Sequence, residues 1–171
     1  GGLIGVNGDA DWGNTSLINM LNGGIAVWEN SFETSRNYHV SGSNGYFDIG
    51  PGLILTQNAA AVIDGGNSVI KRGLGTMVLN GTNAVTGIYL GDGILQFNTQ
   101  GSLGDAATTS SFSFGNDQGL GGSTGNTRYT GGTVRINFSG TTARGIVFNN
   151  NSNTNFSGGI DVTTGNICTL T

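Results

Sequence analysis

Charge is scarce in this sequence. Asp, Glu, Lys and Arg make up 9% of its 171 residues, whereas an average soluble protein has about 25% of these residues. The six Lys and Arg residues are spread along the whole chain, and the formal net charge is -4. Nucleic-acid binding needs clustered Lys and Arg side chains that contact the phosphate backbone. Because this chain has no such basic patch, we expect no nucleic-acid partner.

Cysteine pairs, histidines and long apolar runs are also missing or nearly so. Cys168 is the only cysteine, which excludes an intrachain disulfide framework and a thiolate metal cluster, and we expect it to be a small buried hydrophobe. A catalytic triad would need His39, the only histidine, but the run "NYHV" is typical of a strand in which Tyr38 and Val40 face away from it. No apolar run approaches the roughly 18 residues of a membrane-spanning helix.

Glycine, by contrast, is abundant, with 33 residues, and Asn, Thr and Ser dominate the remainder. These residues favour turns and sheet surfaces, whereas strong helix formers are few. Short β-rich runs recur, each bounded by Gly, Asn, Asp or Ser, which is the signature of strands. They begin at Gly24, Asn37, Tyr46, Leu53, Ser68, Thr76, Gly87, Ile94, Ser111, Thr133, Gly145, Ile160 and Ile167. We therefore expect an all-β fold, with a long polar loop from Gly115 to Gly132.

The shortness of these runs favours a parallel β-solenoid, with a β-sandwich as the alternative. Sandwich strands usually have about five to ten residues and are joined by hairpins, whereas many runs here are shorter and are separated by single Gly or Asn residues. At roughly 20 to 25 residues per coil, residues 1–171 would form about seven or eight coils of one segment. Because the chain starts at Gly1 without an initiator Met and stops inside the run "NICTLT", we interpret it as part of a longer or repeating polypeptide.

An internal similarity also indicates a repeating architecture. Residues 22–56 resemble residues 130–164, because both contain a glycine pair and a strand and then run through an Asn-rich turn to an aromatic residue. The ungapped identities are Gly23, Gly24, Ser31, Thr34 and Arg36 with Gly131, Gly132, Ser139, Thr142 and Arg144. Self-similarity of this kind is expected of a solenoid.

The most specific pattern is "VIKRGLGTMVLNGTNAVTGIYLGDGILQFNTQGSLG", residues 69–104. It resembles the autotransporter-associated β-strand repeat of bacterial passenger domains, in which an apolar pair and Lys precede spaced glycines, alternating apolar residues and further spaced Asn, Gly and Leu. The matching residues are Lys71, Gly73, Gly75, Thr76, Leu79, Gly81, Asn83, Thr86, Gly87, Gly93, Leu95, Leu103 and Gly104. Val85 and Ile94 depart from the pattern, which more often has Tyr and Thr there.

This resemblance implies a right-handed parallel β-helix that a bacterium exports across its outer membrane and displays outside the cell. It implies no catalytic activity, because the repeat marks architecture. We therefore expect the residues of the pattern to serve the structure of the coils and not a chemical site.

Alternation and charge suggest where the first residues of the pattern lie. In "TMVL", Met77 and Leu79 fall on one face of a strand and Val78 falls on the other. Lys71 and Arg72 are expected at a solvated edge, where charge discourages unwanted strand pairing.

The asparagines of the pattern suggest corners. Asn80, Gly81 and Asn83 suit left-handed positions, which a Cβ atom otherwise penalises. Asparagines stacked at successive corners would hydrogen-bond along the solenoid as a ladder, as they do in cross-β stacks.

The best metal candidate is the turn "NGDADWG", where Asn7, Asp9 and Asp11 have the spacing that begins a Ca²⁺ loop. Trp12 stands where such a loop needs glycine, and Ile18 stands at its twelfth position in place of Glu. We therefore expect an ordinary Asx-rich turn there, with no metal and no other cofactor.

Catalysis on a β-helix usually needs clustered carboxylates. The only acids close in the sequence are Asp9 with Asp11 and Glu29 with Glu33, although stacked coils can bring distant acids to the roughly 5 to 10 Å of a glycosidase pair. We expect no enzymatic activity.

Aromatic residues aligned on one face would instead form a binding surface. The candidates are Trp12, Trp28, Tyr38, Tyr46, Tyr89 and Tyr129.

The sequence therefore predicts a non-catalytic extracellular solenoid with a structural or adhesive role, such as a surface stalk, passenger or fibre segment. Its partners would be neighbouring coils or further copies stacked end to end, because solenoid ends expose unpaired strands. Host-surface or glycan ligands would bind its faces. Two alternatives stay open: a polysaccharide lyase or hydrolase on the same scaffold, and a carbohydrate- or protein-binding module.

Overall fold

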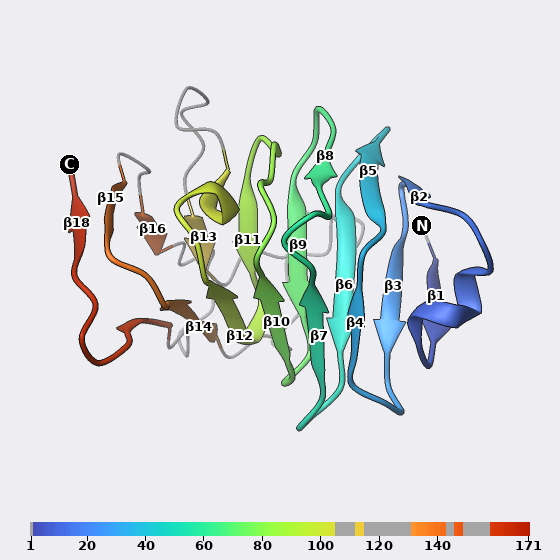
Figure 1. Cartoon of the computed structure of the whole chain (residues 1–171), viewed down its shortest axis with the longest axis horizontal. Coiled ribbons are helices and arrows are strands. Elements are labelled where there is room, and N and C mark those ends of the chain that lie inside the picture. The colour runs from blue at the N-terminus through green and yellow to red at the C-terminus, as the bar shows by residue number, and fades with distance from the viewer. Residues whose placement is uncertain (1, 105–111, 115–130, 143–145, 149–157) are drawn as a thin grey trace.

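The structure is a computed structural model that describes residues 2–104, 112–114, 131–142, 146–148 and 158–171 (Figure 1). The N-terminal strands are β1 (Leu3–Val6), β2 (Leu17–Leu21), β3 (Gly24–Val27), β4 (Phe32–Thr34), β5 (Asn37–Ser41), β6 (Gly45–Ile49), β7 (Ile54–Gln57), β8 (Ile63–Asp64) and β9 (Val69–Arg72). The strands that follow are β10 (Thr76–Leu79), β11 (Ile88–Leu90), β12 (Asp92–Phe97), β13 (Phe112–Phe114), β14 (Gly131–Ile136), β15 (Gly140–Thr142), β16 (Ile146–Phe148), β17 (Gly159–Val162) and β18 (Cys168–Leu170). Two short 3-10 helices, η1 (Asp9–Trp12) and η2 (Gly101–Leu103), accompany them, and no helix in these ranges has the length and hydropathy of a membrane span.

The strands form the three walls of a solenoid. One wall is a seven-stranded sheet of order β1-β3-β6-β9-β11-β13-β16, and the second is a six-stranded sheet of order β17-β14-β12-β10-β7-β4. The third wall contains β2-β5-β8 and, further along, β15-β18. From β3 to β8 the chain visits the seven-stranded sheet, the six-stranded sheet and the third wall in turn, whereas the strands β9 to β14 alternate between the two larger sheets. Neighbouring strands within each wall are parallel. The predicted β-solenoid is therefore confirmed, and the alternative of an antiparallel sandwich was wrong.

The described residues form about five stacked coils, fewer than the seven or eight expected from chain length. The register of the six-stranded sheet accounts for part of the difference. Leu79 pairs with Phe97, which lies 18 positions later, whereas Phe97 pairs with Ile136, which lies 39 positions later. The step from Phe97 to Ile136 therefore contains many more residues than the coil length that was assumed from the sequence.

Each of the predicted β-rich runs overlaps a strand, but the sequence missed β1, β2, β4, β8 and β15. β4, β8 and β15 have only two or three residues and lack a clear apolar run. β1 and β2 are as apolar as the strands that were found, so no feature of their composition explains why they were missed. Most of the predicted polar loop, residues 115–130, lies outside the described residues, whereas Gly131 and Gly132 begin β14.

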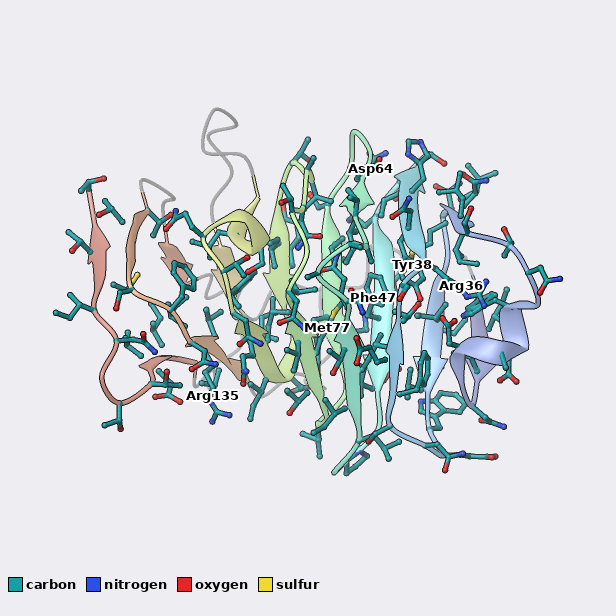
Figure 2. The ribbon with its side chains drawn as sticks, viewed as in Figure 1. Arg36, Tyr38, Phe47, Asp64, Met77 and Arg135 are labelled. Atoms are coloured by element: carbon teal, nitrogen blue, oxygen red, sulfur yellow. The ribbon has the colours of Figure 1, made fainter. Side chains whose placement is uncertain are left out.

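A thin column of apolar side chains fills the space between the walls (Figure 2). Met77 and Leu79 are buried while Val78 between them is half-buried, which confirms the predicted alternation. Tyr38 on the third wall packs edge-to-face on Phe47 of the seven-stranded sheet, with ring centroids 5.4 Å apart. The six-stranded sheet contributes a register-aligned buried row, which consists of Leu55, Met77, Leu95 and Val134.

The two segments that resemble each other in sequence lie on different walls. Gly24 belongs to β3 of the seven-stranded sheet, and its counterpart Gly132 belongs to β14 of the six-stranded sheet. Likewise, Thr34 lies in the six-stranded sheet and Thr142 lies on the third wall. Residues 22–56 and 130–164 are therefore offset by one wall, and the internal repeat stays a prediction.

Candidate functional site

Lys71 lies inside the solenoid, so the solvated position predicted for it was wrong. The side chain is fully buried, and its register partners are Phe47 and Leu90, which are buried too. The Nζ atom donates hydrogen bonds to the carbonyl oxygens of Gly73 and Asp92, the latter at 3.1 Å. Because Gly73 follows β9 and Asp92 begins β12, one ammonium group joins the corners of two successive coils.

The surroundings of Lys71 shift its ionisation. Burial lowers the pKa of Lys71 to about 8, because removal from water penalises the charged form, while the carboxylates of Asp48 and Asp92 oppose that shift. At neutral pH the side chain is therefore still a cation, enclosed by main-chain oxygens. Lys71 and Asp92 are both buried, so this cluster of one base and two acids is closed to a substrate.

Two glycines of the repeat pattern make room for this corner. Gly93 has a φ of 71°, and a Cβ atom built there would lie 2.6 Å from Nζ of Lys71. Gly73 has a φ of 70°, and a Cβ atom there would lie 2.6 Å from Oδ1 of Asp48. Both positions combine a left-handed backbone with a lack of space, so only glycine fits without strain.

Arg72 is also enclosed, although it points to the opposite face of β9 from Lys71. The side chain is nearly buried, and its guanidinium carbon lies 4.0 Å from the centre of the Tyr46 ring in the adjacent strand β6. This geometry is a cation–π contact. The solvated edge predicted for Arg72 was therefore wrong.

A pair of buried amides lies deeper in the same coils. Gln57 Nε2 donates to Asn83 Oδ1 at 2.7 Å and to the carbonyl oxygen of Ala61 at 2.9 Å. Asn83 Nδ2 donates to the carbonyl oxygen of Ser102 at 3.0 Å, and Asn83 Oδ1 accepts from the amide of Ile63 at 3.1 Å. The Asn83 side chain thus bonds the coil before it and the coil after it.

The left-handed conformations predicted for Asn80, Gly81 and Asn83 were wrong. In the described ranges, Asn22 is the only non-glycine residue with positive φ, at 54°, and Gly81 is not among the glycines with positive φ. Asn83 serves through its buried side chain and not through its backbone conformation.

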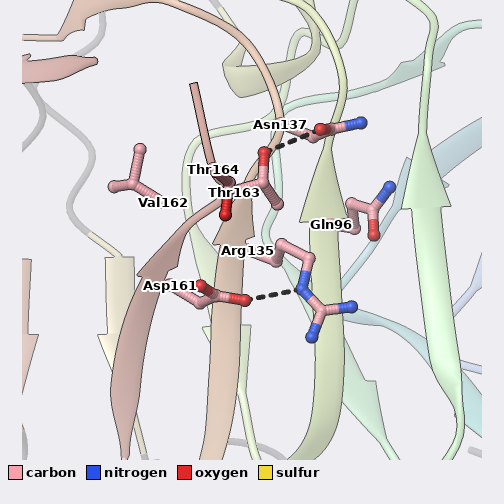
Figure 3. A pocket seen from close by; sticks show the side chains of 7 residues that line it. All are labelled: Gln96, Arg135, Asn137, Asp161, Val162, Thr163 and Thr164. Carbon is pink, nitrogen blue, oxygen red and sulfur yellow. Dashed lines mark hydrogen bonds and ion pairs between the residues drawn. The ribbon is translucent and has the colours of Figure 1, made fainter. Parts of the chain in front are cut away.

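The predicted asparagine ladder is present on the outside of the solenoid. Asn98 Nδ2 donates to Asn80 Oδ1 at 2.7 Å, and Asn137 Nδ2 donates to Asn98 Oδ1 at 3.0 Å. Thr163 continues the ladder, because its Oγ1 donates to Asn137 Oδ1 at 2.7 Å (Figure 3). Each of the four residues directly follows a strand of the six-stranded sheet.

At the N-terminal turn, the carboxylates proposed as metal ligands accept hydrogen bonds from protein groups. Asp11 Oδ2 accepts a hydrogen bond from the Asn7 amide at 2.6 Å, and Asp9 Oδ1 accepts one from Arg36 Nε at 2.9 Å. Arg36 Nη2 also donates to the carbonyl oxygens of Asp9 and Gly13. Arg36 therefore fixes this turn to the next coil, and the part of the chain with described coordinates holds no group of three His, Cys, Asp or Glu residues arranged for a metal.

His39 lies on the outer face of the third wall, as its strand pattern predicted. The neighbours Tyr38 and Val40 are buried, whereas the side chain of His39 is 45% exposed. Its Nδ1 lies 2.6 Å from Oδ1 of Asp64, whose side chain is 47% exposed, on the adjacent strand β8. The pair is a surface contact between two coils.

The other residues singled out in the sequence are dispersed. Trp28 is 62% exposed, Tyr38 and Tyr46 are buried, and Trp12 packs against the core, so these aromatics share no exposed row. Tyr89 is half-buried, and Tyr129 lies outside the described residues. Cys168 is half-buried and contacts the core, so it is less enclosed than expected.

An open polar groove of about 340 Å³ lies on the outer face of the six-stranded sheet (Figure 3). Gln96 of β12, Arg135 of β14 and Asp161 of β17 occupy one cross-strand row. Arg135 Nε donates to Asp161 Oδ2 at 2.8 Å, and the two side chains are 34% and 44% exposed. The remaining lining residues are Asn137, Val162, Thr163 and Thr164, and we call the whole set the polar groove.

Sequence reasoning missed the polar groove and the buried Gln57. The row of Gln96, Arg135 and Asp161 becomes visible only when the register is known, and the long step from Phe97 to Ile136 hides that register in the sequence. Gln57 carried a weak signal, because it sits at a position where alternation from the buried Leu55 calls for an inward side chain.

Many of the described polar side chains thus share one arrangement, in which a side chain of one coil forms a hydrogen bond with a neighbouring coil. Lys71, Asn83, Asn98, Arg36 and Arg135 all follow it. Comparison of the chain with protein-family models, with curated proteins and with solved structures gave no match.

Proposed function

We propose that this chain is a non-catalytic structural segment, a β-solenoid stalk, passenger or fibre with an adhesive role at a bacterial cell surface. The observation that carries the proposal is the use of polar side chains as links between coils. Lys71, the Gln57–Asn83 pair and the ladder through Asn98 each tie one coil to its neighbour. A rod built this way resists separation of its coils.

The proposed location, exported and associated with the outer membrane, rests on the resemblance of residues 69–104 to passenger repeats. The geometry supports that resemblance in one respect. Lys71, Gly73 and Gly93, which are spaced residues of the pattern, meet at a single corner between coils.

End-to-end stacking is the second part of the proposal, and the exposed side chains of β17 support it. Val134 and Ile136 point into the solenoid from β14 and are 2% and 3% exposed. Their register partners in β17, Ile160 and Val162, are 41% and 39% exposed. A further coil, from this polypeptide or from another copy, would cover these apolar side chains.

A mechanical experiment tests the structural role. The full chain is held between two reference domains and pulled in a single-molecule force spectrometer, and we expect it to extend in steps of about one coil. The variant Asn83→Ala should yield at a lower force, while the surface variant His39→Ala should match the wild type. Extension at negligible force would contradict the proposed role.

Two further assays address catalysis and location. Incubation with neutral and acidic polysaccharides should release no reducing ends and no unsaturated products, and release of either would favour the lyase or hydrolase. An antibody against the chain should lose its signal when intact cells of the source organism are treated with protease. A signal that is protected until lysis would overturn the surface location.

A further inference from the structure

The polar groove has hydrogen-bonding capacity that the coil-to-coil links do not use. The bond between Arg135 and Asp161 uses Nε and Oδ2, so the Nη groups and Oδ1 remain for a ligand. Gln96 donates through Nε2 to Asn98 at 2.8 Å, which leaves its Oε1 as an acceptor. Within the described residues, Thr164 makes no hydrogen bond through its hydroxyl, and it is exposed at the groove.

We propose that the polar groove binds a short neutral oligosaccharide. A pair of adjacent sugar hydroxyls both donates and accepts hydrogen bonds, and the Arg135 Nη groups beside Asp161 Oδ1 present the matching donors and acceptor. The volume of about 340 Å³ falls within the usual range of small-molecule sites, which is about 300–1,000 Å³. This binding goes beyond the structural role and does not depend on it.

The lining side chains are held in place before a ligand arrives. Arg135 is fixed by Asp161 on the neighbouring strand, and Gln96 is fixed by Asn98 of the ladder. Asn137 is fixed on both sides, by Asn98 and by Thr163. Side chains that are already ordered lose little conformational entropy on binding, which favours even a small ligand.

Charge selects a neutral ligand over a polyanion. The positive charge of Arg135 is balanced by Asp161 at 2.8 Å, and the chain as a whole carries a net charge of -4. An acidic polysaccharide would meet repulsion at long range, and among the described lining residues it would meet no unbalanced cation. Because none of the described lining residues is an aromatic that could stack on a sugar ring, the affinity for one disaccharide is expected to be weak, with a Kd on the order of 1 mM.

The test is a titration of the isotope-labelled full chain followed by amide NMR shifts. The probes are cellobiose, maltose and lactose, with digalacturonic acid as the anionic arm. At least one neutral disaccharide should shift the amide signals of residues 135, 161 and 164 with a saturable, millimolar Kd. Arg135→Ala should raise that Kd at least tenfold.

Two further variants keep the test independent of folding. Thr164→Ala removes an exposed hydroxyl that has no described bond, so it should leave stability unchanged and raise the Kd about threefold. Glu33→Gln changes the same outward row at the opposite end of the sheet, and it should leave the Kd unchanged. If Arg135→Ala has the same free energy of unfolding as the wild type, its weaker binding comes from the lost side chain and not from a loss of fold.

Three results would overturn the inference. One is the absence of saturable shifts with all three neutral disaccharides at 50 mM. Another is equal affinity of the wild type, Arg135→Ala and Thr164→Ala. The third is tighter binding of digalacturonic acid than of any neutral sugar. The force and protease measurements do not depend on any of these results, so failure here is distinguishable from failure of the structural role.

Discussion

The interior amides and the exterior ladder perform the same task in two different environments. Gln57 and Asn83 bond successive coils within the core, where both are almost fully buried. Asn98 and Asn137 bond successive coils at the surface, where water reaches them. When a surface partner is removed, water replaces it, whereas a buried partner leaves groups that nothing else satisfies. The two regions therefore differ in how much stability one amide provides.

The largest effect is expected from Asn83→Ala. This change leaves the Ile63 amide and the Ser102 carbonyl unpaired inside the solenoid and removes one of the two hydrogen bonds of Gln57 Nε2, whose bond to Ala61 remains. At about 1–3 kcal/mol for each unsatisfied buried group, the free energy of unfolding should fall by about 3–5 kcal/mol. Denaturant titration of this variant beside Asn80→Ala, the matched surface change, measures the difference. A loss below about 1 kcal/mol for Asn83→Ala would mean that the buried amides stabilise the fold no more than the surface amides do.

Lys71→Met tests the buried region through the pH dependence of the free energy of unfolding. The unfolded chain keeps the Lys71 proton up to its ordinary pKa of 10.5, whereas the folded chain releases it near pH 8. Between these values the unfolded state binds more protons, so the wild type gains stability as pH rises. Relative to Lys71→Met, the gain from pH 7 to pH 10.5 should be on the order of 3 kcal/mol. Denaturant titrations at several pH values measure this gain. If the difference in unfolding free energy between the wild type and Lys71→Met stays constant from pH 7 to pH 10.5, the ammonium group is not buried.

Asn98→Ala removes the centre of the exterior ladder and should cost much less than Asn83→Ala. It breaks the bonds to Asn80 and Asn137, but all three positions are accessible to water. We expect a loss of about 1 kcal/mol in the free energy of unfolding. The same denaturant titration measures it, and a loss as large as that of Asn83→Ala would mean that the ladder is effectively desolvated.

His39→Ala is expected to have the smallest effect. The pair with Asp64 is nearly half exposed on both sides, and exposed ion pairs contribute about 0–1 kcal/mol. The midpoint of thermal unfolding should therefore stay within about 2 °C of the wild type at pH 7. A larger shift would place this surface contact among the groups that hold the coils together.

Local rules predicted the strands and the ladder but not the register. Alternation located Met77 and Leu79 because a single strand decides which side chains share a face. The ladder followed from asparagines at successive strand ends. The polar groove did not follow, because the row through Arg135 depends on pairing across a step of 39 positions. No local property of the chain encodes the length of that step.

The error at Lys71 has a different physical cause. In "VIKR" each face carries one apolar and one cationic residue, so alternation alone does not say which face is inside. Charge argues for solvent, but the corner supplies main-chain oxygens from Gly73 and Asp92 that stabilise a buried cation. Those oxygens come from the turn and from the next coil, and their positions exist only once the coils have stacked.

The unequal spacing of the register also bears on how the chain folds. Most pairing steps close loops of about 20 residues, so a coil that has formed can template the next one and the structure can propagate as a zipper. The step from Phe97 to Ile136 closes a loop of 39 positions, against 18 for the step from Leu79 to Phe97. The additional loop-closure entropy is about 0.7 kcal/mol. Propagation is therefore expected to pause there, which divides the chain into an N-terminal stack that nucleates first and a C-terminal stack that follows.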